Sequence, residues 1–233
     1  MLAKIKNLAL DILFPPLCLA CDKYLSDSSD QICLDCLASM PLFSHISCPV
    51  CLARITDYGN RCHKDSPYLL AAATDYSHPV AQKLIWQFKY GGWQSLAGII
   101  SGFFPLSSIP VENKANWFVV PLPLHSSRKK RRGFNQAELL AEKAARKLNL
   151  ACIIDNLVRV KHTSVQADLK NYKEREENVR NAFFVENPEQ FKGKNIILVD
   201  DVFTSGATLG EAARVLKLVG VKRIVALVFA RAR

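Results

Sequence analysis

Residues 196–209 read IILVDDVFTSGATL. Four apolar residues, typical of a strand buried within a parallel sheet, run into two adjacent carboxylates, Asp200 and Asp201. Hydroxyl groups and backbone N–H groups at the helix start that follows would bind an anion, and the two carboxylates could accept hydrogen bonds from vicinal hydroxyls. The stretch therefore predicts a site for a ribose 5-phosphate. Its phosphate loop consists of Thr204, Ser205, Gly206, Ala207 and Thr208.

An ordinary strand-loop-helix turn is the alternative, because Thr, Ser and Gly are common at any helix start. The ordered combination of strand, acid pair, loop and apolar helix favours the phosphate site. In that order the segment resembles the motif with which type I phosphoribosyltransferases bind 5-phosphoribosyl 1-diphosphate (PRPP).

The bulk composition limits the partners. The chain has 233 residues, 31 basic and 21 acidic side chains, and a net charge of +10. Such a charge favours polyanions such as nucleic acid, diphosphate or an anionic membrane. An amphipathic helix is expected over residues 3–13, but Asp11 and the pair Pro15-Pro16 interrupt the apolar run too early for a signal peptide. No segment approaches the ~20 apolar residues of a membrane span, so a cytoplasmic location is expected.

Seven of the eight cysteines lie between positions 18 and 62. Two CxxC turns can surround one ion with four thiolates, and in a reducing compartment disulfides are the poorer alternative. The first two turns predict one zinc site made of Cys18, Cys21, Cys33 and Cys36.

A second metal site is less complete, because no cysteine follows Cys62 at the expected spacing. Its candidate ligands are Cys48, Cys51, Cys62 and His63. His45 could replace His63, and His63 could equally be a surface histidine. A crossed pairing of the first turn with the third also stays open at this point. Cys152 lies far away in an apolar stretch and is expected to be a core thiol.

From about residue 69 strands and helices alternate, which predicts an α/β fold with a mainly parallel sheet. Residues 1–68 are expected to form a Cys-rich zinc-ribbon module, and residues 69–233 the α/β domain. Strands are expected over 69–76, 117–120, 153–160, 183–185, 196–199 and 223–229. Helices are expected over 78–90, 94–104, 134–150 and 206–219.

Residues 119–136 read VVPLPLHSSRKKRRGFNQ. Ligands bind beyond the carboxyl ends of strands in open α/β sheets, so His125 and Arg128 could reach a diphosphate there. Clustered basic side chains would also hold a nucleic-acid backbone, whereas a solvated basic loop is the plainer interpretation. The basic run consists of Arg128, Lys129, Lys130, Arg131 and Arg132. Residues 161–181 are highly charged; they suit either a mobile loop covering a reaction centre or a surface helical hairpin.

Taken together, these motifs resemble the ComF family of competence-associated, phosphoribosyltransferase-like proteins. The matching features are the CxxC turns, the VPLPL loop, RGFNQ at 132–136, Thr163 to Gln166, Arg175 to Asn178, and VDDVFTSGAT. The incomplete fourth CxxC turn departs from the family pattern.

The resemblance implies a type I phosphoribosyltransferase-like sheet behind a zinc ribbon. Asp200 and Asp201 would hold the ribose hydroxyls and residues 204–208 the 5-phosphate. The loop 121–125 with Arg128 would face the diphosphate, with Mg²⁺ bridging the ligand's oxygens.

It also implies a role in DNA uptake and natural transformation, handling single-stranded DNA in the cytoplasm beside a helicase or recombination mediator. A metabolic phosphoribosyltransferase acting on a free nucleobase is the alternative, and whether catalysis is retained stays open. Only 24 residues follow Leu209, and they predict one helix and one strand without a hood over a base. Base recognition would then fall to the zinc module or to residues 69–110.

Overall fold

The computed structural model describes residues 15–27, 30–58, 62–161 and 172–232. The helix expected over residues 3–13 and the stretch from Thr163 to Gln166 lie outside the described residues. Among the described residues, no helix has the length and apolar character needed to cross a membrane.

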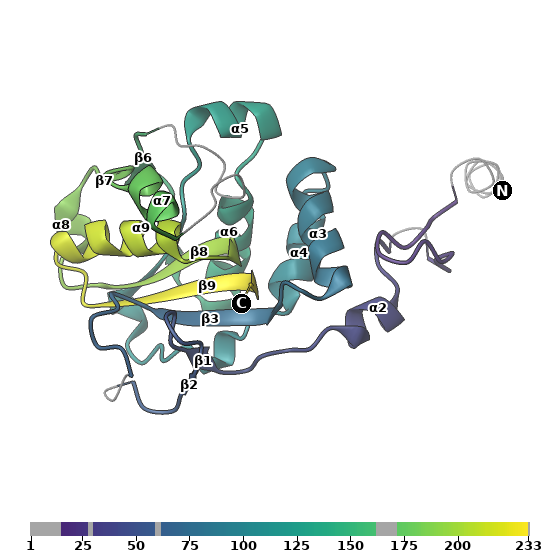
Figure 1. The fold of residues 1–233 in the computed structure, drawn as a ribbon, viewed down its shortest axis with the longest axis horizontal. Helices are drawn as coiled ribbons and strands as arrows, with labels where there is room; N and C mark the ends of the chain where they lie inside the picture. Colours follow the sequence, from purple (N-terminus) through teal and green to yellow (C-terminus); the bar gives the residue numbers. More distant parts are fainter. Residues whose placement is uncertain (1–14, 28–29, 59–61, 162–171, 233) are drawn as a thin grey trace.

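The molecule is organised around a seven-stranded sheet in the order β2-β1-β3-β9-β8-β4-β5 (Figure 1). The five strands from β3 to β5 in that order are mutually parallel, and β1 and β2 are antiparallel additions. The bounds are β1 Ile46–Ser47, β2 Arg54–Ile55, β3 Leu69–Asp75, β4 Trp117–Pro121, β5 Ala151–Cys152, β8 Asn195–Phe203 and β9 Arg223–Arg231. The predicted mainly parallel α/β fold is therefore confirmed.

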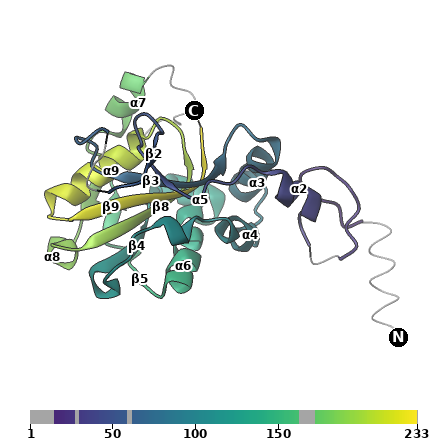
Figure 2. The ribbon, with the colours of Figure 1, turned by 90° about the horizontal axis from the view of Figure 1, so that it is seen from below.

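Helices cover both faces of this sheet, as the view in Figure 2 shows. One face packs against α3 (Pro79–Tyr90), α4 (Leu96–Gly102) and α6 (Gln136–Leu148). The other face packs against α9 (Ala207–Leu218) and α8 (Pro188–Phe191), with α7 (Tyr172–Val179) beyond α9. Because both faces are covered, Ile196 to Val199 are all buried, which explains the unbroken apolar run in the sequence.

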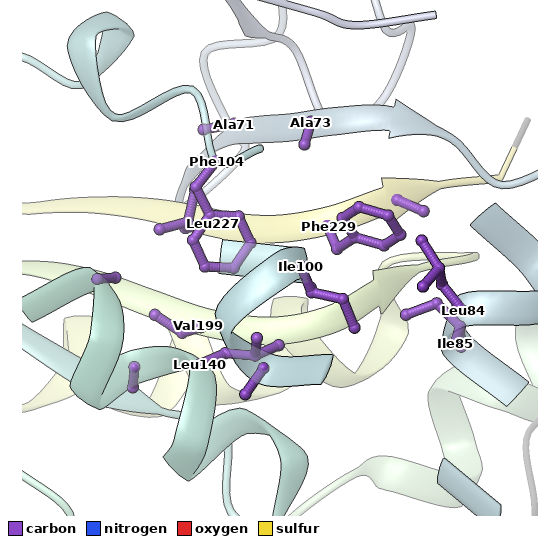
Figure 3. Close-up of a cluster of buried hydrophobic side chains, with 14 of the residues drawn as sticks. Ala71, Ala73, Leu84, Ile85, Ile100, Phe104, Leu140, Val199, Leu227 and Phe229 are labelled. Carbon is purple, nitrogen blue, oxygen red and sulfur yellow. The ribbon is translucent and has the colours of Figure 1, made fainter. Parts of the chain in front are cut away.

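Alternate strand residues point into the two halves of the core. Ala71 and Ala73 of β3, Val199 of β8 and Leu227 and Phe229 of β9 all lie on the face covered by α3, α4 and α6 (Figure 3). Alanines on β3 let the helices approach the sheet closely, and Ile100 of α4 and Leu140 of α6 fill the space between them.

The strand expected over 153–160 is wrong in detail. The chain instead forms β5, then leaves the sheet and forms β6 (Leu157–Arg159), which pairs antiparallel with β7 (Phe183–Val185) as a separate ribbon. Asn156 causes the break, because its buried amide donates to the carbonyl of Asn187 at 3.0 Å and accepts from the Asn187 N–H at 2.6 Å. A side chain that pairs with backbone in this way replaces the strand ladder.

The cysteine-rich region is joined to the sheet. β1 pairs with β3, and the Arg231 guanidinium at the end of β9 donates to Ser47 Oγ at 3.0 Å and lies 4.2 Å from the Phe43 ring centroid. The division between residues 68 and 69 stays a prediction, since β1 lies before it and pairs with β3, which lies after it. The described residues up to the end of the short helix α2 (Leu34–Ser39) extend beyond α3 and α4, and the chain then returns along β3 toward β1 (Figure 1).

Candidate functional site: a cationic cavity at the ends of the parallel strands, and two cysteine clusters

A cavity of about 480 Å³ opens at the carboxyl ends of the parallel strands, where ligands bind in sheets of this kind. Its floor is the end of β8 and the loop after it, and its walls come from α3, the segment after β4, and the basic residues of the run at 128–132. Two carboxylates and five cationic side chains line it, so its net charge suits an anionic ligand. These are Asp200, Asp201, Lys89, Arg128, Arg132, Arg159 and Arg175.

The acid pair lies inside β8, because the strand continues through both aspartates to Phe203. Lys89, from the last turn of α3, reaches Asp201 with Nζ 2.8 Å from Oδ1. The Asp201 side chain is 8% exposed and that of Lys89 is 20% exposed, so this is a buried ion pair. Lys89 belongs to no motif of the sequence, so only the structure identifies it as part of this site.

Asp200 is the more perturbed of the two acids. Burial and then the neighbouring charge of Asp201 raise the pKa of Asp200 to about 7, although Lys89 acts in the opposite direction. Burial alone would lower the pKa of Lys89, but the two aspartates outweigh it and the pKa is raised above its usual value. Two adjacent carboxylates, one of them with a pKa near 7, can accept hydrogen bonds from hydroxyl groups or face a hydrated divalent cation.

The phosphate loop requires a glycine at its centre. Gly206 precedes α9 with φ +76°, and a Cβ there would meet Phe203 and the Tyr68 hydroxyl at 2.8 Å. The N-cap residue Gly206 has no side chain to cap α9; the Ala207 N–H donates to Ser205 Oγ at 3.4 Å, and N–H groups of the first turn face the loop. Thr204, Gly206 and Thr208 line the cavity, and this end of a twelve-residue helix therefore offers donors to an anion.

The basic run forms a helix, α5 (Ser126–Arg132), where a loop was expected. The helical repeat places the five basic residues on different faces of α5. Arg128 and Arg132 are one turn apart and line the cavity. Lys129 pairs instead with Glu138, Nζ to Oε1 at 2.9 Å, and Lys130 and Arg131 are exposed. The basic run at 128–132 therefore contributes to two surfaces, one that lines the cavity and one that faces solvent.

Other predicted ligand contacts lie outside the cavity lining. His125 begins α5, and its Nδ1 accepts from the Ser127 backbone N–H at 3.3 Å. Ser205 and Ala207 line a neighbouring cavity of about 900 Å³ between α9 and residues 49–68, which shares Phe203, Thr204 and Gly206 with the first.

Two arginines from the charged stretch near residues 159–178 also reach the cavity. Burial and the charge of Arg128 lower the pKa of Arg159 to about 10, which reflects the concentration of positive charge here. Arg175 lies on α7, at the far side of the segment that the structure leaves undescribed.

The first cysteine cluster brings together the four predicted ligands Cys18, Cys21, Cys33 and Cys36, with all four sulfurs within 4.8 Å of one another. Cys21 Sγ lies 3.7 Å from Cys33 Sγ, close to the ~3.8 Å expected around a tetrahedral zinc ion. Burial opposes ionisation of Cys18, yet backbone N–H groups, led by that of Cys33, lower the pKa of its thiol to about 6. The donor set fits zinc, and the crossed pairing is excluded.

The second cluster is complete as well, with His63 beside Cys48, Cys51 and Cys62. His63 Nδ1 lies 3.4 Å from Cys48 Sγ, and Cys51 and Cys62 are 3.3 Å apart at sulfur. Hydrogen bonds from the backbone of Ala53 and from Cys62 lower the pKa of Cys51 to about 7. Three thiols and one imidazole form a common structural zinc set, so His63 replaces the missing cysteine.

Comparisons with known proteins match two separate parts of the chain. A family model described as a double zinc ribbon domain matches residues 9–64, and one described as a phosphoribosyl transferase domain matches residues 135–233. Competence protein F of Haemophilus influenzae is 39% identical over 107 residues, 46% of each chain. DNA utilization protein YhgH of Escherichia coli is 32% identical over 142 residues, 59% of this chain and 61% of that one.

The match spans about half to three fifths of these relatives' length. Among solved structures, a phosphoribosylpyrophosphate synthetase from Mycobacterium smegmatis is 18% identical with a TM-score of 0.32, covering 58% of this chain and 33% of that chain. That overlap is too small to support an argument. The sequence matches do support one: the predicted resemblance to the ComF family is confirmed, because this chain is similar to competence protein F and matches a double zinc ribbon model ahead of a phosphoribosyl transferase domain model.

Proposed function

We propose that this protein binds PRPP, or a related ribose 5-phosphate, with Mg²⁺ in the cationic cavity, and handles single-stranded DNA in the cytoplasm during DNA uptake. The observation that carries the proposal is the cavity itself, in which a helix N-terminus, an acid pair and five cations face one space. Asp200 and Asp201 would accept the ribose hydroxyls, and the loop at 204–208 the 5-phosphate. Arg128 and Arg132 would neutralise the diphosphate, each charged hydrogen bond contributing about 1.5–3 kcal/mol.

PRPP binding is tested by calorimetry in the presence of Mg²⁺. We expect Asp200→Asn to bind PRPP roughly 10- to 150-fold more weakly than the native protein, because it removes a charged acceptor of a ribose hydroxyl. Asp155→Asn makes the same change at an exposed acid outside the cavity lining and should leave the affinity unaltered. Equal binding by all three proteins would contradict the proposed site.

The metabolic alternative predicts a different result with the same material. Release of diphosphate on mixing PRPP with a free nucleobase would support it. PRPP binding without turnover of any common base would support a binding or sensing role instead. The zinc ribbon would then be the candidate docking surface for a helicase or recombination mediator.

Contact with single-stranded DNA is tested by substituting the exposed basic residues of α5 separately from those that line the cavity. Replacing Lys130 and Arg131 by Ala should lower DNA affinity and reduce the log–log salt slope by about 1.4, at ~0.7 per phosphate contact. PRPP binding should not change, because these exposed side chains do not line the cavity. Replacing Arg128 and Arg132 should weaken PRPP binding.

The control removes the same charge elsewhere. Lys222 and Arg223 are exposed at the start of β9, at the opposite end of the sheet from the cavity. If the variant with Ala at both of these positions loses as much DNA affinity as the Lys130/Arg131 variant, DNA binding depends on the net charge of the protein and not on a contact with α5.

A further inference from the structure

Two large aromatic side chains are exposed at the mouth of the cavity. Trp86 and Tyr90 lie one helical turn apart on α3 and are 55% and 57% exposed, yet both line the 480 Å³ cavity. The opposite face of the same helix is buried, with Leu84, Ile85 and Phe88 in the core. Neither aromatic ring is therefore needed to hold α3 on the sheet, and large exposed apolar groups that line a cavity usually mark a binding surface.

The two rings are arranged as a shelf and have cations beside them. Their centroids are 6.2 Å apart with planes inclined at 53°. The Arg132 guanidinium from α5 lies 5.2 Å from the Tyr90 ring centroid, so α3 and α5 meet at this point. A ring face with an arginine beside it suits a planar, electron-rich ligand such as a nucleobase.

Unused hydrogen-bond donors lie next to the shelf. Arg132 Nη1 donates to Gln136 Oε1 at 3.1 Å, but Arg132 Nε and Gln136 Nε2 are buried with no acceptor among the described residues. Gln136 itself is 2% exposed. Buried donors without an acceptor are rare in native structures, and here they indicate a ligand that carries acceptors, as base carbonyls and phosphates do.

We propose that Trp86 and Tyr90 form a stacking shelf for a base of single-stranded nucleic acid, beside the ribose-phosphate site. The inference rests on the proposed function, because it places the base next to a ribose held by the acid pair. Lys89, which pairs with Asp201, directly precedes Tyr90, so the shelf and the acid pair are joined by one ion pair. The shelf lies within residues 69–110, one of the two regions expected from the sequence to recognise a base.

A polynucleotide fits the shelf better than a free base. Both rings are open to solvent, whereas a site for a small base would enclose it. Lys130 and Arg131 are exposed on α5, the helix whose Arg132 contacts Tyr90, so they could hold the phosphate backbone of a longer strand. Stacking platforms combined with cationic tracks are the usual means of binding single strands.

The test compares two single strands of equal length: a short thymidylate oligonucleotide, and an abasic deoxyribose-phosphate strand. Trp86→Ala should bind the thymidylate strand about 5- to 150-fold more weakly and leave binding of the abasic strand unchanged. Trp86→Phe should recover most of the loss. Trp93→Ala, at a tryptophan that is 41% exposed and outside the cavity lining, is the matched control and should bind both strands normally.

Fluorescence gives a direct signal of stacking. The Trp93→Phe protein retains Trp86 and the buried Trp117. In this variant the thymidylate strand should quench tryptophan emission and the abasic strand should not. The inference is overturned if Trp86→Ala and Trp93→Ala bind the thymidylate strand with equal affinity. It is also overturned if Trp86→Ala weakens binding of the abasic strand as much as binding of the thymidylate strand. If free thymidine saturates the same quenching with an affinity equal to that of the thymidylate strand, the proposal that a polynucleotide occupies the shelf is overturned.

The two proposals fail separately. If the native protein binds no PRPP, the proposed function fails whatever the oligonucleotides do. If PRPP binds as expected but Trp86→Ala leaves the thymidylate strand unaffected, only the stacking shelf fails.

Discussion

Removal of zinc by a chelator should unfold residues 15–58 while the parallel strands from β3 to β5 stay folded. Zinc binding contributes about 10–16 kcal/mol to small modules of this kind. Residues 15–45 contribute a few buried side chains to the core, such as Leu25, Ile32 and Met40, but their regular structure is one six-residue helix and two isolated bridges among the described residues. Amide hydrogen exchange before and after chelation measures this, and protection should fall in this region and persist in β8 and β9.

The two clusters should respond independently, and metal analysis can separate them. The native protein should hold about two zinc ions per chain, one for each four-ligand set. Cys36→Ser should reduce this to about one, whereas Cys152→Ser, which alters a cysteine outside both clusters, should retain both. A protein that keeps two ions after Cys36→Ser, or holds only one before it, would contradict the assignment.

Acid should release the metal as well. Zinc binds thiolates, so protons compete with it, and the most acidic thiols are Cys18 and Cys51, whose pKa values are lowered to about 6 and about 7. Falling pH protonates these ligands, so zinc content should decline on acidification and recover on neutralisation with added zinc.

The predictable part of the site is the part encoded in consecutive residues. The acid pair, the glycine loop and the CxxC turns each need particular residue types at fixed short spacing. Gly206 shows why: its positive φ and the 2.8 Å approach to Phe203 leave no space for a Cβ. A requirement of this kind restricts the position to one residue type, so it can be recognised in the sequence.

The parts that were missed depend on how separate elements meet. Lys89 looks like a solvated lysine at a helix end, and only the position of α3 against β8 brings it to Asp201. Likewise, a run of five basic residues gives no sign of which members face inward until its helical phase is known. His63 had two equally good interpretations because its partner Cys48 is fifteen residues away.

Strand lengths set a similar limit. β1 and β2 have two residues each, too few for an alternating pattern, so their addition to the edge of the sheet could not be read from the sequence. The break at Asn156 was hidden because the apolar residues on both sides of it continue the strand pattern.

The buried ion pair between Lys89 and Asp201 should be among the most costly side-chain interactions to break. Removing one partner leaves an uncompensated buried charge, and we expect Lys89→Met to lower the free energy of unfolding by about 3–5 kcal/mol. The matched control is Lys192→Met, which breaks an ion pair with Glu189 whose side chains are 67% and 78% exposed. That change should cost less than about 1 kcal/mol. Urea denaturation of both variants measures the difference.

A double-mutant cycle separates the pair from its surroundings. Asp201→Asn alone leaves Lys89 buried without its ion-pair partner, whereas Lys89→Met with Asp201→Asn removes both charges. The double variant should therefore lose less stability than the sum of the two single variants, by about 0.5–3 kcal/mol. Strict additivity would show that Asp201 is not the partner that compensates Lys89.

The same lysine should control how stability depends on pH. The pKa of Asp200 is raised from 3.8 to about 7, so the folded protein retains a proton that the unfolded chain has already lost. Between about pH 4 and 7 the folded state binds more protons, and Asp200 makes stability fall as pH rises through this window. Lys89 opposes that rise in pKa, so Lys89→Met should move the upper limit of the window above pH 7 and deepen the loss. Asp200→Asn added to Lys89→Met should abolish this dependence, and if the fall persists without Asp200, another group is responsible for it.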